Sequence, residues 1–283
     1  MKAVKIVGVP EHFNFPWLMA INEGAFKSRG IELIWEDVPE GTGRMSSMLK
    51  NGEADLAIIL TEGIVKSIIE GNPSKIVQEF IASPLQWGIH VAAKSDYQIL
   101  DDLKNKTVAI SRFGSGSHLM SFVNAQNLGW DTTSLDFHVV NTLNGAIEAL
   151  TEGSADYFMW EHFTTKPIVD KGIFRRLADC PTPWPCFVIA ATDSFIKENK
   201  GCLRHILETI NRYTSEFKRI PSIDRTLANN YGQQLEDIRE WLSMTQWSQT
   251  QIDVQTIEIV QDQLLKLDLT DHKLEVNNLI TNL

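Results

Sequence analysis

Apolar and polar positions follow one another along most of the chain in a pattern typical of alternating strands and helices. In the first part of the chain the apolar runs predict strands at 4–9, 31–36 and 56–60. The last run is entirely apolar, which is typical of a strand in a parallel sheet covered on both faces. Helical spacing between the strands predicts two helices, the first beginning near Pro16. Their apolar faces are formed by Leu18, Ile21 and Ala25 and by Met45, Met48 and Leu49.

The same series of elements restarts after residue 100. We expect a helix at 101–105 with Asp101 as N-cap, followed by a strand at 108–110. Leu119, Phe122, Val123 and Gln126 then fall on one side of a helix. The remaining elements expected here are strands at 136–140 and 156–160, a helix at 143–151 and a helix from 162. Stretches 75–82, 86–93 and 186–191 have strand character, and from 193 onward the chain is expected to be helical, with breaks at Pro221 and Gly232.

A short motif occurs twice, about a hundred residues apart. Leu49–Asp55 returns as Leu150–Asp156, each time between a helical pattern and a short apolar strand. The repeat predicts two similar α/β lobes in one polypeptide, and a cleft between two lobes is a common place for a small ligand.

Composition narrows the classes of function. A chain of 283 residues with 43% apolar residues can form two domains, and its formal net charge of -10 argues against a nucleic-acid partner. No run of about eighteen apolar residues exists, so no membrane insertion is expected. The three cysteines (Cys180, Cys186, Cys202) have no metal-site spacing and suit a reducing compartment, although one disulfide stays open. No apolar leader precedes the first strand, which predicts a cytoplasmic protein, or a periplasmic one if a leader has been removed.

Several short motifs in one order resemble the substrate-binding proteins of ABC transporters, in the group that binds sulfonates, taurine, nitrate and thiamine-pyrimidine precursors. These motifs are Asn22–Phe26, Gly30–Leu33, Gly41–Gly43, Gly52–Asp55, Leu103–Ala109, Gly114–Ser117 and Trp160–Phe163. The resemblance implies the type II periplasmic-binding fold, with one lobe formed by 1–87 plus 187–283 and the other by 88–186. It also implies hinge closure around a small-molecule ligand, an ABC permease as a potential partner and no cofactor.

Relatives of the same fold are cytoplasmic enzymes of thiamine-pyrimidine or menaquinone biosynthesis, so an enzyme is the alternative, with His118 as acid or base. The thiamine-type synthase carries a run of cysteines that Asp179–Cys186 does not supply. We expect no catalytic residue and no metal site in the binding-protein interpretation.

The loops after the strands contain the candidate binding residues, because ligands of such sheets lie beyond the carboxyl ends of the strands. Two glycine-rich loops lead directly into helices, where backbone N–H groups and the helix dipole favour an anionic group. The alternative is that these glycines only permit turns and that the hydroxyls only cap helices. The expected ligand-binding residues are Phe13, Asn14, Gly41, Thr42, Gly43, Thr61, Glu62, Arg112, Phe113, Ser115, Gly116, Ser117, Trp160, Glu161 and Trp184.

Charged and aromatic side chains in these loops suggest the kind of ligand. Arg112 would hold a carboxylate or sulfonate, or else form a salt bridge with Glu62 or Glu161. Glu161 would accept N–H bonds from an amine or heterocycle, or else interact with a helix dipole. The loop aromatic rings would stack on a flat ligand, although several must be core, Trp17 above all. Of the loop histidines, His12, His118 and His162, we expect at most one to contact ligand. The sequence therefore predicts a binding protein for a small anionic, aromatic or heterocyclic solute.

Overall fold

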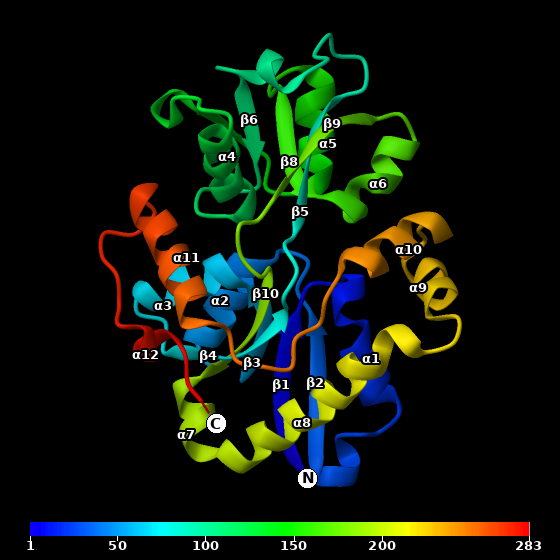
Figure 1. Ribbon diagram of the computed structural model, residues 1–283, viewed down its shortest axis with the longest axis vertical. Helices are drawn as coiled ribbons and strands as arrows, with labels where there is room; N and C mark the ends of the chain where they lie inside the picture. The colour runs from blue at the N-terminus through cyan, green and yellow to red at the C-terminus, as the bar shows by residue number, and fades with distance from the viewer. Residues whose placement is uncertain (283) are drawn as a thin grey trace. The chain divides into compact units, whose positions relative to one another are not determined.

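The computed structural model describes residues 1–282, which form two compact units (Figure 1). Unit 1 comprises Met1–Pro84 together with the chain from Trp184 onward, and unit 2 comprises Leu85–Pro183. The chain thus passes from one unit to the other after Pro84 and after Pro183, three residues before each boundary expected from the sequence.

Unit 1 contains a mixed five-stranded sheet with the order β2-β1-β3-β10-β4. Its strands are β1 (Lys2–Gly8), β2 (Ile31–Asp37), β3 (Leu56–Leu60), β4 (Ser74–Ile81) and β10 (Phe187–Thr192). β1 is parallel to β2 and β3, whereas β10 runs antiparallel to β3 and β4. Every residue of β3 is buried, as the uninterrupted apolar run predicts for a central strand.

The helices of unit 1 pack around this sheet. They are α1 (Phe15–Asn22), α2 (Thr42–Lys50), α3 (Thr61–Ile69), α7 (Asp193–Glu198), α8 (Lys200–Glu216), α9 (Ile223–Tyr231), α10 (Leu235–Met244), α11 (Val254–Lys266) and α12 (Val276–Leu279). Three short 3₁₀ helices are η1 (His12–Asn14), η2 (Lys27–Arg29) and η5 (Phe217–Arg219). α1 packs against α8, and α3 against α11. Over the described residues no helix is both long and apolar enough to cross a membrane.

Unit 2 repeats the sheet of unit 1 in the order β7-β6-β8-β5-β9. Its strands are β5 (Gln86–Ala92), β6 (Thr107–Ile110), β7 (Asp136–Val139), β8 (Tyr157–Glu161) and β9 (Phe174–Pro181). Its helices are α4 (Gly116–Asn127), α5 (Leu143–Glu152) and α6 (His162–Asp170), with 3₁₀ helices η3 (Leu100–Leu103) and η4 (Thr132–Ser134). β6 is parallel to β7 and β8, while β5 is antiparallel to β8 and β9, so the strand directions match those of unit 1 position by position.

The repeated sequence motif makes the same contacts in both units. In unit 1, Asp55 Oδ2 accepts the backbone N–H of Lys5 over 2.8 Å, and the Asp55 N–H donates to the Lys5 carbonyl over 2.9 Å. In unit 2, Asp156 forms the same pair with Thr107, over 2.8 and 2.9 Å. The aspartate ties the loop before one strand to the strand beside it. The motif is therefore repeated in the structure as well as in the sequence.

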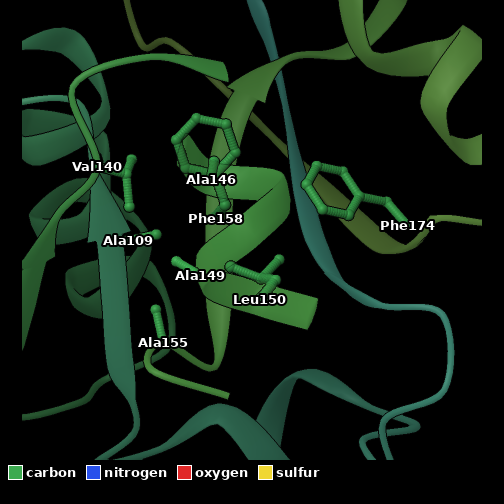
Figure 2. Close-up of a cluster of buried hydrophobic side chains, with 8 residues drawn as sticks. All are labelled: Ala109, Val140, Ala146, Ala149, Leu150, Ala155, Phe158 and Phe174. Atoms are coloured by element: carbon green, nitrogen blue, oxygen red, sulfur yellow. The ribbon is translucent and has the colours of Figure 1, made fainter. Parts of the chain in front are cut away.

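The core of unit 2 lies between α5 and the sheet (Figure 2). Ala146, Ala149 and Leu150 on α5 face the strands that carry Ala109 and Phe158 (Figure 2). Small alanines on the helix let the phenyl ring pack closely, which suits the density of a protein interior.

α1 is shorter than the sequence indicates, because Gly24 adopts a left-handed conformation (φ +70°) just after its end. The prediction of a face with Ala25 is wrong: the helix ends at Asn22 and buries Trp17 and Ala20 instead. Trp17 is fully buried and stacks on Phe26, which confirms its expected place in the core.

One strand was not predicted, and two further predictions of secondary structure are wrong. The missed strand is β9, whose half-buried residues include two arginines and so lack a strand-like apolar pattern. The chain after 193 is not all helical, because residues 246–250 pair with β4 through Ser248 N–H to Phe80 O and Glu79 N–H to Thr250 O. The helix expected at 101–105 is the 3₁₀ turn η3, and Asp102 rather than Asp101 accepts the N–H groups at its start.

Candidate functional site

Two helices of unit 1 begin beside each other, at the carboxyl-terminal side of the parallel strands. A Cβ atom added to Gly63, in the first turn of α3, would lie 2.1 Å from Cγ2 of Thr42, the first residue of α2. Only a glycine allows this approach. The N-cap of α2 is Gly41, whose backbone (φ +77°, ψ −158°) favours glycine and which has no side chain to cap the helix. The first-turn N–H groups of a helix have no partner within the helix. At α3 the N–H of Thr61 is taken by the Cys186 carbonyl, whereas α2 begins without a side-chain cap and presents donors.

Glu62 is a buried carboxylate in the first turn of α3. Its Oε2 accepts the indole N–H of Trp184 over 2.8 Å, whereas its Oε1 is buried without a hydrogen-bond partner. The side chain is 2% exposed, and this burial raises the pKa of Glu62 to about 7. The hydrogen bonds from Trp184 and from its own backbone oppose that rise only in part.

Thr61 ties the start of α3 to the loop that carries Trp184. Its hydroxyl donates to the carbonyl of Pro185 over 2.6 Å, and its N–H donates to the carbonyl of Cys186 over 3.0 Å. These bonds fix the chain that precedes β10 against α3. The indole of Trp184 is thereby held in reach of Glu62.

Phe13 belongs to a buried aromatic cluster rather than to an open stacking surface. Its ring centroid lies 5.2 Å from that of Phe187 and 5.1 Å from that of Trp241. Phe13 is only 4% exposed. Asn14 donates from Nδ2 to the Val9 carbonyl over 2.8 Å, and its Oδ1 is buried without a partner.

His12 is buried in the same cluster, with its ring centroid 4.1 Å from that of Trp241. Neither ring nitrogen has a hydrogen-bond partner. Burial lowers the pKa of His12 to about 3, so the ring is neutral near pH 7.

In unit 2, three buried serines surround the start of α4. Ser115 is the N-cap and its Oγ accepts the N–H of His118 over 3.3 Å. Ser117 accepts the N–H of Ser111 over 3.0 Å and lies 3.0 Å from the Ser115 hydroxyl. Gly116 is the first residue of the helix. Ser115 therefore caps α4, which was the alternative explanation for its hydroxyl, whereas Ser117 binds the loop residue Ser111.

His118 packs among aromatic rings at the same helix start. Its Nδ1 accepts the N–H of Gly114 over 3.1 Å, which places the proton of a neutral ring on Nε2. The ring makes edge contacts with Phe113, Phe122 and Phe137. Phe113 is itself 66% exposed, and Arg112 beside it is half-buried. These surroundings give His118 a structural role and do not favour the enzymatic alternative.

Glu161 caps α6. Its Oε2 accepts both the N–H and the hydroxyl of Thr164, over 2.6 and 2.8 Å. Burial raises the pKa of Glu161, and the bonds from Thr164 oppose the rise. Trp160, half-buried, stacks on Phe158 at 5.3 Å between ring centroids.

The next residue, His162, bonds through Nδ1 to Asp179 Oδ1 over 2.9 Å. Within residues 1–282 no group of acids, histidines and cysteines is arranged to hold a metal ion, and none of the three cysteines forms a disulfide.

The structure thus groups the predicted residues into two sets, each within one unit. Unit 1 holds Phe13, Asn14, Gly41, Thr42, Gly43, Thr61, Glu62 and Trp184, and unit 2 holds Arg112, Phe113, Ser115, Gly116, Ser117, Trp160 and Glu161. Sequence reasoning did not single out Gly63 or Ser111. A glycine in the first turn of a helix was the available signal for Gly63, whereas a lone serine after a strand gave none.

Comparison with solved structures defines the class of protein: the chain has the type II periplasmic-binding fold. A Candida albicans protein, described as defining a new family with the generic periplasmic binding protein fold, is 25% identical and aligns with a TM-score of 0.89 over 99% of this chain and 96% of that one. Residues 87–180 match the family model described as Ca3427-like PBP, which is named for that kind of protein.

Two bacterial sulfonate-binding proteins share the fold. The alkanesulfonate-binding protein of Xanthomonas axonopodis pv. citri, bound to MOPS, is 16% identical, with a TM-score of 0.84 over 100% of this chain and 99% of that one. The periplasmic aliphatic sulphonate-binding protein of Escherichia coli is 17% identical, with a TM-score of 0.75 over 100% and 94%. No curated protein matches the sequence.

Proposed function

We propose that this protein is a solute-binding protein that takes up one small anionic molecule and closes around it. The observation that carries the proposal is the paired helix start in unit 1, where Thr42 and Gly63 touch and no side chain caps α2. Uncapped helix starts favour anions because their N–H groups and dipoles both point at the ligand.

The start of α4, in unit 2, is a second set of donors that suits an anion. Ser115 and Ser117 are buried there: Ser115 accepts the N–H of His118 and Ser117 accepts that of Ser111, which leaves the other first-turn N–H groups of α4 to the ligand. A sulfonate or carboxylate has the several acceptor oxygens that such a set of N–H groups requires. The sulfonate-binding relatives of this fold support an anion of that kind.

Aromatic side chains make a ring-containing anion a better candidate than a bare inorganic one. Phe113 and Trp160 keep exposed surface, whereas Phe13 and Trp184 are buried. Stacking on a flat ligand would therefore involve Phe113 and Trp160. Delivery of such a solute to an ABC permease is the transport role that we propose for the protein.

A thermal-shift screen of the full chain tests the proposal. The panel contains pyrimidines, aromatic carboxylates, alkyl and aryl sulfonates, and nitrate. We expect a sulfonate or aromatic carboxylate to raise the melting temperature, since a ligand that binds only the folded state adds stability. The same compound should lower the radius of gyration in solution scattering. Failure of every anion to stabilise the protein would contradict the proposed function.

Two matched variants separate binding from folding. Ser115→Ala removes the cap of α4, while Thr192→Ala removes the cap of α7, where the hydroxyl accepts the N–H of Phe195. Each should cost about 1 kcal/mol of stability. Because β10 is antiparallel to β3, α7 starts at the opposite edge of its sheet, so only Ser115→Ala should weaken binding.

A further inference from the structure

Glu62 has a feature that the anion-binding role does not explain. Within the described residues it is the only carboxylate with a buried oxygen that lacks a hydrogen-bond partner. A buried acceptor without a partner costs free energy, and a buried charge without a partner costs more. An anionic solute would gain nothing from it. The unpartnered oxygen of Glu62 therefore suits a ligand group that donates a hydrogen bond.

Glu161 shows how the same fold satisfies a carboxylate at a helix start. Thr164, three residues later, gives Glu161 both an N–H and a hydroxyl. Glu62 is the second residue of α3 rather than its N-cap, so its side chain does not make the capping contact that Glu161 makes. Glu62 receives one side-chain bond, from Trp184, and its second oxygen is left over.

The carboxylate is held in place by its surroundings. Trp184 fixes Oε2, and Thr61 binds the two residues after Trp184 through its hydroxyl and its N–H. A rigid acceptor recognises a donor at low entropic cost, because the protein does not have to order the side chain on binding. Burial also strengthens a charge-assisted hydrogen bond.

We propose that Oε1 of Glu62 accepts a hydrogen bond from an ammonium or other charged N–H group of the ligand, so that the solute is an amino-bearing anion rather than a simple one. This inference rests on the proposed function. The uncapped start of α2, which touches α3 next to Glu62, takes the anionic end of the same molecule. Opposite charges a short distance apart in one small molecule match the acid and the helix donors in unit 1.

Calorimetric titration of the full chain with matched compounds tests the inference. The probes are taurine against ethanesulfonate, homotaurine against propanesulfonate, and para-aminobenzoate against benzoate; each pair differs in its amino group. We expect the amino member of at least one pair to bind about tenfold more tightly. Equal affinities in all three pairs would overturn the inference and leave the proposed function standing. If no member of any pair binds, the proposed function fails and this inference fails with it.

The variant Glu62→Gln locates the effect. It keeps the shape and the bond from Trp184 but removes the charge, so the preference for the amino member should fall about tenfold while the affinity for the amino-free member changes little. A preference that survives in Glu62→Gln would also overturn the inference. Trp184→Phe serves as the second variant, because it frees Oε2 without removing the acid and should retain the preference. The comparison of paired ligands uses the natural protein, so this test does not depend on whether a variant folds.

Discussion

Trp184 donates its indole N–H to Oε2 of Glu62 over 2.8 Å, although 122 residues separate them in the chain. The bond joins the start of α3 to the segment that enters β10, the strand that lies beside β3 in antiparallel orientation. It leaves the acid buried with a single side-chain donor. The stability of unit 1 and the ligand recognition that we propose for it therefore involve the same carboxylate.

The first prediction concerns Glu62 and stability against pH. Its pKa rises from an ordinary 4.5 to about 7 in the folded protein, so the folded state holds a proton that the unfolded state has lost. Its contribution is fully present below pH 4.5 and is lost as pH rises through 7, a loss of about 3 kcal/mol. Urea unfolding at pH 5 and pH 8 should show that Glu62→Gln gains stability over the natural protein at the higher pH.

Glu152→Gln, at an exposed position in unit 2, is the control and should leave the difference between the two pH values unchanged. Equal pH dependence of the natural protein and Glu62→Gln would show that Glu62 is charged in the folded state at little cost.

The second prediction concerns His12, whose effect has the opposite sign. Its folded pKa of about 3 lies below the ordinary 6.5, so the unfolded state binds the proton first. Stability from this group is full above pH 6.5 and falls toward pH 3. Between pH 7.5 and pH 5 the natural protein should lose about 2 kcal/mol more than His12→Phe. His138→Gln, at a half-buried position in β7, should behave as the natural protein does; a His12→Phe curve parallel to it would contradict the assignment.

The third prediction concerns the contact between α2 and α3. Alanine favours a helix over glycine, yet Gly63→Ala would place Cβ 2.1 Å from the Thr42 methyl, so we expect a loss of about 1–3 kcal/mol. Thr42→Ser removes that methyl. In the double variant the loss should shrink markedly, which a double-mutant cycle on urea unfolding measures. Stabilisation by Gly63→Ala alone would show that the two helix starts are not in contact.

The fourth prediction compares the two repeated aspartates. Both accept a backbone N–H, but Asp156 also accepts the hydroxyl of Tyr97 over 2.5 Å. Asp156→Ala should therefore destabilise its unit by about 1 kcal/mol more than Asp55→Ala destabilises its own. In a Tyr97→Phe background the difference should disappear. Hydrogen exchange, which reports on each unit separately, is the suitable measurement.

Local patterns in the sequence predicted much of the fold. The apolar run of β3 and the repeated motif ending in Asp55 and Asp156 depend on neighbouring residues, and both have the expected structure. β9 was not predictable in this way, because its half-buried arginines give no apolar alternation. Residues 246–250 look helical locally but pair with β4, a choice made by tertiary contacts.

The sequence indicated which kinds of residues lie at the candidate site, but not which of them contact one another. Glycine-rich loops before helices indicated Gly41 and Thr42, and the structure places both at the start of α2. We expected Glu161 either to accept ligand N–H groups or to interact with a helix dipole; it caps α6 through Thr164, and Glu62 has the unpartnered oxygen. Trp184, the partner of Glu62, lies 122 residues away in the chain, so no local sequence pattern indicates the contact.

Calorimetric titration of the natural protein with the most stabilising anion from the screen decides whether the protein is a solute-binding protein. We expect saturable binding of one molecule per chain, weakened by Ser115→Ala and unaffected by Thr192→Ala. Absence of saturable binding by any sulfonate or carboxylate would contradict a solute-binding role. Equal weakening of the affinity by both variants would show that the start of α4 does not bind the ligand.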